Sequence, residues 1–285
     1  MTESPAQAFA AQLLAAMAKL GVRNFFLAPG ARSQALAIAA GQLADAGKLD
    51  LTIRIDERGL GFLALGAALA SGEPSVVITT SGTAVANLHP AVLEANHAGV
   101  PLILLTADRP HELRGVGANQ TTNQIGIFGD AVRTCFDLEA PTADSPSLDE
   151  VRYVVATAIA AALGETGHQP GPVQINLAFR EPLSGSEPNA ADLKLEPLDF
   201  KPVTPEFEFA LLDGTVPTVV VAGAEAGPEA TELAEAFGWP LLAEPSSGAR
   251  FGENAILGYR LVITERRDLA DNIGRVIVFG KPTLS

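Results

Sequence analysis

The sequence is poor in several residue types that mark particular structures or chemistries. Its 285 residues include one cysteine, one tryptophan and two tyrosines, and 19 lysines and arginines stand against 33 aspartates and glutamates. The single Cys135 excludes an intrachain disulfide, and its apolar neighbours favour a buried packing role over a reactive one. The formal net charge of −14 argues against nucleic acid as a partner, so an anionic small substrate would need its own local arginines.

Long apolar runs and several common site motifs are also missing. No run approaches the roughly 18 uninterrupted apolar residues that cross a bilayer, and residues 1–10 carry no basic, hydrophobic signal peptide. We therefore expect a cytoplasmic chain with no membrane partner. The four histidines show no metal-ligand spacing, and no Ser, His and Asp order indicates a hydrolase triad. TTSGT (79–83) lacks the P-loop lysine, and GAEAGPEA (223–230) does not complete a dinucleotide fingerprint.

Hydrophobic residues make up 47% of the chain, enough for substantial cores, and they alternate between helical and buried-strand patterns. Continuous apolar strands that alternate with helices predict an α/β fold, with a parallel sheet covered by helices on both faces. We place this first domain at residues 1–184. Its predicted helices are 5–20, 33–46, 59–70, 83–95 and 148–163, and its predicted strands are 23–28, 51–55, 75–79, 102–107 and 173–179.

The alternation of helical and strand patterns stops after the first domain and then resumes. Residues 185–214 are rich in proline and acid without a clear period, which predicts a linker. A second α/β domain follows over 215–285, and it ends so soon after its last strand that we expect it to be incomplete and the chain to be the first part of a longer protein. Its predicted elements are strands 216–224, 239–244 and 275–280 and a helix over 228–237.

Unusual polar residues fall at the predicted carboxyl ends of four strands. APGARS (28–33) follows the first strand, DER (56–58) the second, TTSGT (79–83) the third and ADRP (107–110) the fourth. Ligands of open parallel sheets bind in the crevice outside those ends, where helix N-termini also point their free N–H groups. The sequence therefore predicts a ligand site at this edge.

Two of these motifs have simpler interpretations. Arg32 and Ser33 can form a helix start with a solvated arginine, and Asp56 can cap a helix that has Glu57 in its first turn. The loop RGVGANQTTNQIGIFGD (114–130) is harder to explain in this way. Loops of this length in compact domains are usually functional or disordered, and this one is too apolar for disorder.

Together these segments resemble the 2-succinyl-5-enolpyruvyl-6-hydroxy-3-cyclohexene-1-carboxylate synthase family of menaquinone biosynthesis, whose members use thiamine diphosphate. The resemblance spans roughly residues 5–183, and its most discriminating pair is TADRP followed by GANQ. It implies a pyrimidine-binding first domain and the start of a central domain. The diphosphate-binding domain that holds Mg²⁺ would lie outside this chain, which we then expect to be inactive alone. The motifs that carry the resemblance are APGARS, DERGLGFLALGAALASG, TTSGTAVANLHPAVLEA, LILLTADRP, GANQTTNQIGIFGD and INLAFREPL.

The resemblance implies decarboxylation of 2-oxoglutarate and addition of the product to isochorismate, with thiamine diphosphate and Mg²⁺ as cofactors. Glu57 would bond N1′ of the aminopyrimidine, and we expect it to be buried beside Leu60 and Phe62. Both substrates are carboxylates, which guanidinium groups match in bidentate geometry. Ala31 stands where the family commonly has Ser. The implied cofactor contacts are Glu57, Pro29, Thr80 and Ser81, and the implied substrate contacts are Arg32, Arg109, Asn119 and Gln120.

The resemblance also implies a dimer or tetramer whose cofactor site lies between subunits. The helices over 59–70 and 83–95 are rich in small residues and can form such an interface, although simple packing against their own sheet explains them equally well. Two other functions stay open. One is a thiamine carboligase of the acetolactate synthase type, and the other is a non-catalytic module that senses a pathway product.

Overall fold

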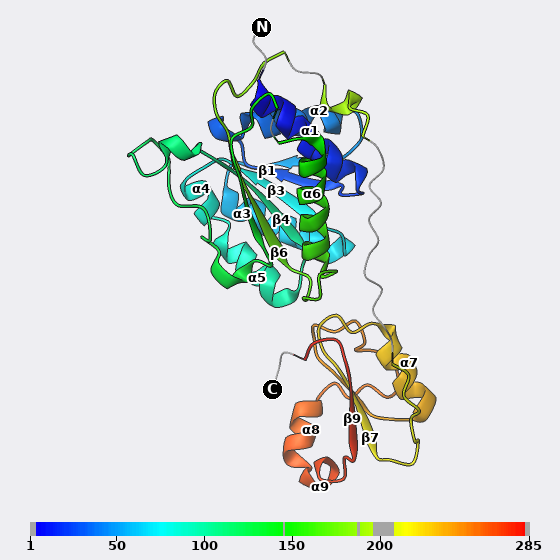
Figure 1. Ribbon diagram of the computed structural model, residues 1–285. Coiled ribbons are helices and arrows are strands. Elements are labelled where there is room, and N and C mark those ends of the chain that lie inside the picture. Colours follow the sequence, from blue (N-terminus) through cyan, green and yellow to red (C-terminus); the bar gives the residue numbers. More distant parts are fainter. Residues whose placement is uncertain (1–3, 145, 187–188, 196–207, 283–285) are drawn as a thin grey trace. The chain divides into compact units, whose positions relative to one another are not determined.

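The computed structural model describes residues 4–144, 146–186, 189–195 and 208–282. The chain divides into two compact units, Met1–Pro205 and Glu206–Ser285. The first unit contains a six-stranded sheet of order β2-β1-β3-β4-β6-β5, in which every pairing is parallel (Figure 1). The predicted α/β class with a parallel sheet is confirmed.

The strands of this sheet are β1 (Asn24–Leu27), β2 (Asp50–Ile53), β3 (Ser75–Thr79), β4 (Leu102–Asp108), β5 (Cys135–Leu138) and β6 (Pro172–Ala178). The helices are α1 (Pro5–Lys19), α2 (Gln34–Asp45), α3 (Glu57–Ser71), α4 (Thr83–Ala86), α5 (His89–Ala98) and α6 (Leu148–Leu163). The sequence did not predict β5. This strand has four residues and includes the exposed Asp137, so it shows no apolar run.

Two hydrophobic cores cover the two faces of the sheet (Figure 1). Helices α1, α2 and α6 pack on one face and α3, α4 and α5 on the other. Adjacent strand residues serve opposite cores: Ile78 belongs to the first core and Val77 to the second. Because both faces are buried, the central strands consist of continuous apolar runs, which is the pattern that made them predictable.

The helix predicted over 83–95 is two helices, α4 and α5. Pro90, in the first turn of α5, has no N–H to donate to the carbonyl of Ala86, and its ring crowds that carbonyl. Proline inside a helix is unfavourable by about 3 kcal/mol, so a break before this position is favoured. The proline is instead accommodated at a helix start, where its missing donor costs nothing.

Helix α3 begins two residues before the predicted start. The side chain of Asp56 caps it, with Oδ1 accepting a hydrogen bond from the backbone N–H of Gly59 at 2.6 Å. Glu57 therefore occupies the first turn, where the helix dipole favours a carboxylate. Leu60 and Ala64 are four residues apart, on one face of the helix, and both are fully buried against the sheet and α5.

Part of the predicted linker packs against the first unit. The short 3₁₀ turn η4 (Ala190–Asp192) contacts α1 and α2, and the N–H of Ala190 donates to Oε1 of Gln42 at 2.9 Å. Leu193 and Leu195 extend the first core. The middle of the predicted linker, 196–207, lies outside the described residues.

The second unit contains a smaller parallel sheet of order β8-β7-β9. Its predicted strands and helix are present as β7 (Thr218–Ala222), β8 (Leu241–Ala243), β9 (Arg275–Phe279) and α7 (Pro228–Phe237). Two further short helices, α8 (Tyr259–Glu265) and α9 (Arg267–Ala270), were not predicted. Neither contains a buried residue, so they leave no apolar period in the sequence.

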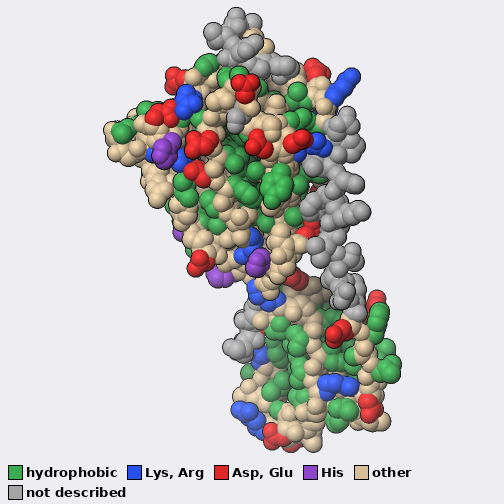
Figure 2. Space-filling model, in the orientation of Figure 1, with side chains coloured by type: hydrophobic (Ala, Val, Ile, Leu, Met, Phe, Trp, Pro, Cys, Tyr) green, Lys and Arg blue, Asp and Glu red, His purple; other side chains and the backbone are tan. Residues whose placement is uncertain are grey.

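Charged side chains of both signs are spread over the visible face of the first unit (Figure 2). Within the described ranges, no helix is both long enough and apolar enough to span a membrane.

Cys135 is half-buried rather than buried, and its thiol lies 3.3 Å from Oε1 of Gln174. Burial raises the pKa of this thiol, in keeping with the predicted packing role.

Candidate active site

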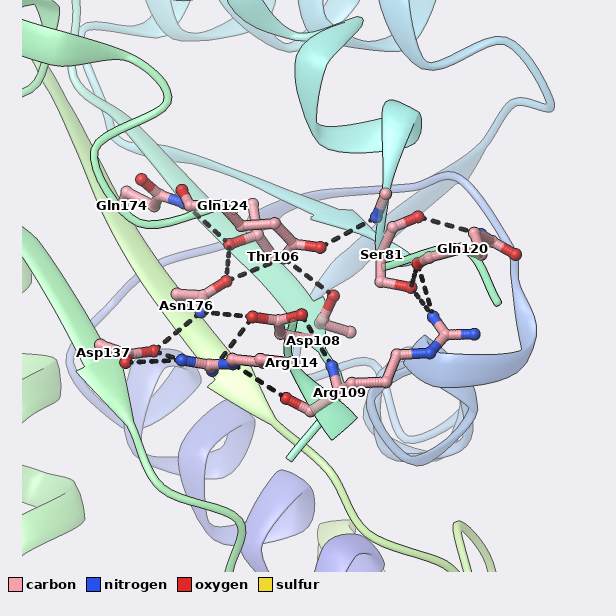
Figure 3. A network of polar contacts seen from close by, with 12 residues as sticks. Ser81, Thr106, Asp108, Arg109, Arg114, Gln120, Gln124, Asp137, Gln174 and Asn176 are labelled. Carbon is pink, nitrogen blue, oxygen red and sulfur yellow. Dashed lines mark hydrogen bonds and ion pairs between the residues drawn. The ribbon is translucent and has the colours of Figure 1, made fainter. Parts of the chain in front are cut away.

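Three of the predicted site residues meet at the carboxyl edge of the sheet (Figure 3). Nη1 of Arg109, at the end of β4, donates to Oγ of Ser81 and to the carbonyl of Gln120, the latter at 3.0 Å. Nε2 of Gln120 donates in turn to the carbonyl of Ser81 at 2.9 Å. Residues that are 28 and 39 positions apart in the chain are thus joined because β3 and β4 are neighbours.

The loops after β1 and β3 touch at the same edge. Strands β1 and β3 are neighbours, but the chain continues from β1 to α2 on one face of the sheet and from β3 to α4 on the other face. Such a switch point between two strands is where open parallel sheets form a ligand crevice at their carboxyl ends. Gly30 packs so closely on the buried Thr80 that an added Cβ would overlap the Thr80 side chain. The exposed Pro29 precedes this contact.

We expect Gly30→Ala to destabilise the chain by about 1 to 3 kcal/mol, because the new methyl group has no space beside Thr80. The measurement is the free energy of unfolding in urea. Gly41→Ala is the control, since no atom lies within 4 Å of a Cβ at that position. In a Thr80→Gly background, where the crowding side chain is gone, Gly30→Ala should cost much less than it does in the wild-type chain. An unchanged stability of the single variant would contradict the close contact.

Arg32 lies in the 3₁₀ turn η1 (Ala31–Ser33) and is turned inward rather than solvated. Its side chain is 11% exposed, and Nη1 donates to the carbonyl of Phe179 at 3.0 Å. The ion pair with Glu181 is long, at 3.9 Å, and that carboxylate is 78% exposed. The Nε atom of Arg32 is buried and has no hydrogen-bond partner among the described residues.

The positive charges of Arg32 and Arg109 interact unfavourably. Burial lowers the pKa of the Arg109 guanidinium and the positive charge of Arg32 lowers it further, whereas Asp108 acts in the opposite direction. Within the described part of the chain, Arg109 forms no ion pair. Two neighbouring guanidinium groups with incomplete neutralisation form a site that an anion would stabilise.

Glu57 lies at the start of α3, and it is only half-buried. Its Oε2 accepts a hydrogen bond from Nδ2 of Asn87 at 3.1 Å. The expected burial beside both Leu60 and Phe62 was wrong, because Leu60 is fully buried whereas Phe62 is 42% exposed. Leu60 and Phe62 are two residues apart in the helix, so their side chains point about 200° apart around the helix axis. They therefore cannot both cover the Glu57 carboxylate.

Two predicted residues lack described side-chain contacts with the cluster. Pro29 is exposed in the turn after β1, and Asn119 is exposed on the loop before Gln120. The backbone carbonyl of Asn119 accepts a hydrogen bond from Oγ1 of Thr121. Asn87, which sequence reasoning missed, is by contrast the hydrogen-bond partner of the Glu57 carboxylate.

A buried polar network behind the cluster was also missed (Figure 3). Oγ1 of Thr106 donates to Oδ1 of Asn176 at 3.0 Å, and Nε2 of Gln174 donates to Oγ1 of Thr106 at 3.1 Å. Thr106 and Asn176 are register partners on β4 and β6. The sequence did carry a signal, because an amide within a fully buried strand must find a hydrogen-bond partner.

Arg114 joins the long loop to this network. Its guanidinium forms ion pairs at 3.0 Å with Asp108 and with Asp137, and Nδ2 of Asn176 donates to both of these carboxylates. Burial acts to raise the pKa of Asp137, but the hydrogen bonds from Arg114 and Asn176 outweigh it and lower the pKa below its ordinary value.

The Asp137 carboxyl should contribute stability that disappears in acid. A carboxyl whose pKa is lowered by folding stabilises the folded state fully above its unfolded pKa, about 3.9, and this contribution is lost as the pH falls through the lower folded pKa. The difference in unfolding free energy between the wild-type chain and Asp137→Asn should therefore shrink as the pH falls from about 5 toward 2. Asp130→Asn, at an exposed position, is the control, and a constant difference for Asp137→Asn would contradict the assignment.

Comparison with known proteins identifies the class that this fold and site define. Residues 7–127 match the family described as "Thiamine pyrophosphate enzyme, N-terminal TPP binding domain". The matched region runs from α1 through the crevice motifs to the long loop. The first unit therefore contains a region similar to the N-terminal domain of thiamine pyrophosphate enzymes.

The relatives are more specific. The chain is 48% identical to the 2-succinyl-5-enolpyruvyl-6-hydroxy-3-cyclohexene-1-carboxylate synthase of Leifsonia xyli subsp. xyli, over 100% of this chain and 48% of that protein. Identity to the synthase of the same name from Kineococcus radiotolerans is 47%, over 99% of this chain and 52% of that protein. The chain is thus similar over its whole length to part of these synthases, and it spans about half the length of the curated relatives it matches.

Proposed function

We propose that this chain forms the pyrimidine-binding and substrate-carboxylate-binding part of a synthase that decarboxylates 2-oxoglutarate and adds the resulting four-carbon unit to isochorismate. The observation that carries the proposal is the pair Arg32 and Arg109 at the crevice beside β1. Both substrates are carboxylates. The inward-turned Arg32, and Arg109, which has no carboxylate partner among the described residues, offer guanidinium donors to them. Gln120 would orient the bound substrate from the loop above, together with Asn119.

The residues at the crevice fit the aminopyrimidine end of thiamine diphosphate. Glu57 supplies a carboxylate at a helix start, held at Oε2 by Asn87, and its other oxygen is available for a ring nitrogen. Pro29, Thr80 and Ser81 would line the crevice at the crossing of the two loops. When bound, thiamine diphosphate supplies the electron sink for decarboxylation.

The proposal places the Mg²⁺ ligands outside this chain. Among the residues that the structure describes, no group of three or more His, Cys, Asp or Glu side chains could hold a metal ion. We infer that the 285-residue chain needs the remaining length of its relatives for activity, since it covers only 48% of the first of them. Measurable carboligation by the purified chain with thiamine diphosphate and Mg²⁺ would contradict this inference.

The substrate assignment is tested with a longer protein that contains this chain. Carbon dioxide release is measured with 2-oxoglutarate and with pyruvate as alternative donors, in the presence and absence of isochorismate. Preference for 2-oxoglutarate and consumption of isochorismate support the proposal. Preference for pyruvate would indicate an acetolactate synthase type of enzyme, and calorimetric binding of a naphthoate without cofactor or turnover would indicate a product sensor.

We also propose that the chain self-associates through the outer face of α3 and α5. The two helices contact each other, and their inner stripe packs on the sheet. The outer face leaves large apolar side chains exposed beside small ones, which is typical of a subunit interface. These side chains are Phe62 at 42%, Leu63 at 41%, Leu69 at 65% and Leu93 at 41% exposure.

Phe62→Glu is expected to weaken self-association about 30-fold, because the variant places an unpaired carboxylate in an apolar interface. Sedimentation velocity over a concentration series gives the dissociation constant. Tyr153→Glu is the matched control, since this aromatic side chain is 69% exposed on α6, at the opposite face of the sheet. Equal effects of the two substitutions would place the interface elsewhere.

A further inference from the structure

We propose that Gln124 is a positioning residue that fixes the Arg109 guanidinium by clamping the long loop onto the sheet. Gln124 is 1% exposed, and every polar atom of its amide is used (Figure 3). Oε1 accepts from the N–H of Gly82 at 2.8 Å, and Nε2 donates to the carbonyl of Ala107 at 3.2 Å and to Oδ1 of Asn176 at 2.9 Å. A fully satisfied buried amide holds its surroundings in one arrangement.

The backbone of Gln124 is held as well. Its carbonyl accepts a hydrogen bond from Nε2 of Gln174 at 3.0 Å, and Gln174 is itself bonded to Thr106. One residue therefore ties the loop to the turn after β3, to β4 and to β6. These partners are separated from it by 17 to 52 positions in the chain.

The clamp acts on Arg109 through Gln120, four residues earlier in the loop. Gln120 has a left-handed backbone with φ of 53°, and it lies against Gly82, where an added Cβ would be 3.0 Å from the Cγ of Gln120 and 3.1 Å from its carbonyl oxygen. That carbonyl accepts from Nη1 of Arg109. The same carbonyl also accepts a hydrogen bond from Oγ of Ser81, which is a second partner of Nη1 of Arg109. Loss of the clamp should therefore weaken the support that the loop gives to the guanidinium and let it move more freely.

The test uses Gln124→Met, which keeps the size of the side chain and removes its three hydrogen bonds. We expect hydrogen exchange of the Gly82 amide, followed by NMR, to become about tenfold faster. The Nη signals of Arg109 should change from slow to averaged rotation about the Nε–Cζ bond. Gln12→Met is the control, because Gln12 is a half-buried glutamine on α1. This substitution should leave both signals unchanged.

A second variant covers the case in which Gln124→Met does not fold. Gln124→Glu keeps an acceptor for the Gly82 amide, but while ionised it cannot donate to Ala107 or Asn176. Averaged rotation of Arg109 at neutral pH should therefore revert to slow rotation as the introduced carboxyl is protonated. A purely packing role for Gln124 predicts no such reversal.

Unchanged Arg109 rotation in the folded variants would overturn the proposal, whether or not exchange at Gly82 becomes faster. The inference rests on the proposed function only for the use of Arg109 as a carboxylate ligand. Both NMR signals are recorded without substrate or cofactor. They therefore test the clamp even if the substrate assay described above favours pyruvate.

Discussion

Replacement of Glu57 by Gln is expected to slow proton loss from C2 of bound thiamine diphosphate by about 100-fold or more, while the fold is retained. The proposed task of this side chain is to share a proton with a ring nitrogen, and a neutral amide cannot alternate between acceptor and donor. Folding should survive because the amide oxygen of the variant can still accept the hydrogen bond from Asn87. Proton–deuteron exchange at C2, quenched with acid and measured by NMR, gives the rate in a longer protein that contains this chain.

The matched control for this experiment is Glu94→Gln, which removes an exposed carboxylate from α5. It should leave C2 exchange unchanged. Near wild-type exchange in Glu57→Gln would remove Glu57 from the proposed chemistry. A structure of the loaded protein in which this carboxylate lies far from any pyrimidine would have the same consequence.

Arg109→Ala is expected to lower kcat/KM for carboligation by about 10- to 100-fold, because a charge-assisted hydrogen bond contributes about 1.5 to 3 kcal/mol. We expect the use of isochorismate to suffer more than the decarboxylation of 2-oxoglutarate. Arg32 remains in the variant and can still attract the carboxylates of the first substrate. Carbon dioxide release without isochorismate is compared with formation of the final product.

Two further substitutions separate charge from geometry at this position. Arg109→Lys keeps the positive charge but loses the planar fork, so it should recover part of the affinity and little of the orientation. Arg23→Ala removes an exposed arginine just before β1, at the opposite edge of the sheet, and should have no effect. Equal losses in the two partial reactions of Arg109→Ala would contradict the assignment of this residue to isochorismate.

The fold was largely predictable because its signals are local. Each central strand is a continuous apolar run, and the longer helices carry a buried stripe, in some cases with a start signal such as the Asp56 cap of α3 or the Ser147 cap of α6. Errors arose where the local signal was weak or mixed. Strand β5 is short and polar at Asp137, helices α8 and α9 bury nothing, and Pro90 divides an otherwise helical stretch.

The location of the candidate site was also predictable, whereas its internal contacts were not. Polar motifs that follow successive parallel strands must share one edge of the sheet, which places Arg32, Ser81 and Arg109 near one another. The hydrogen bond from Asn87 to Glu57 spans 30 positions, and its donor lies in the break between α4 and α5. No local pattern encodes such a pairing.

The sequence by itself determined the α/β class, the order of most elements along the chain and the edge of the sheet at which the polar motifs gather, because apolar periodicity and capping act between near neighbours. Tertiary structure alone decided that Gln124 meets Gly82, that Thr106 meets Asn176, and that one flank of Glu57 stays open. These contacts depend on strand order and register, which bring together residues 30 to 70 positions apart. The physical reason is that a buried polar group must find a hydrogen-bond partner, but its own sequence neighbours do not specify which one.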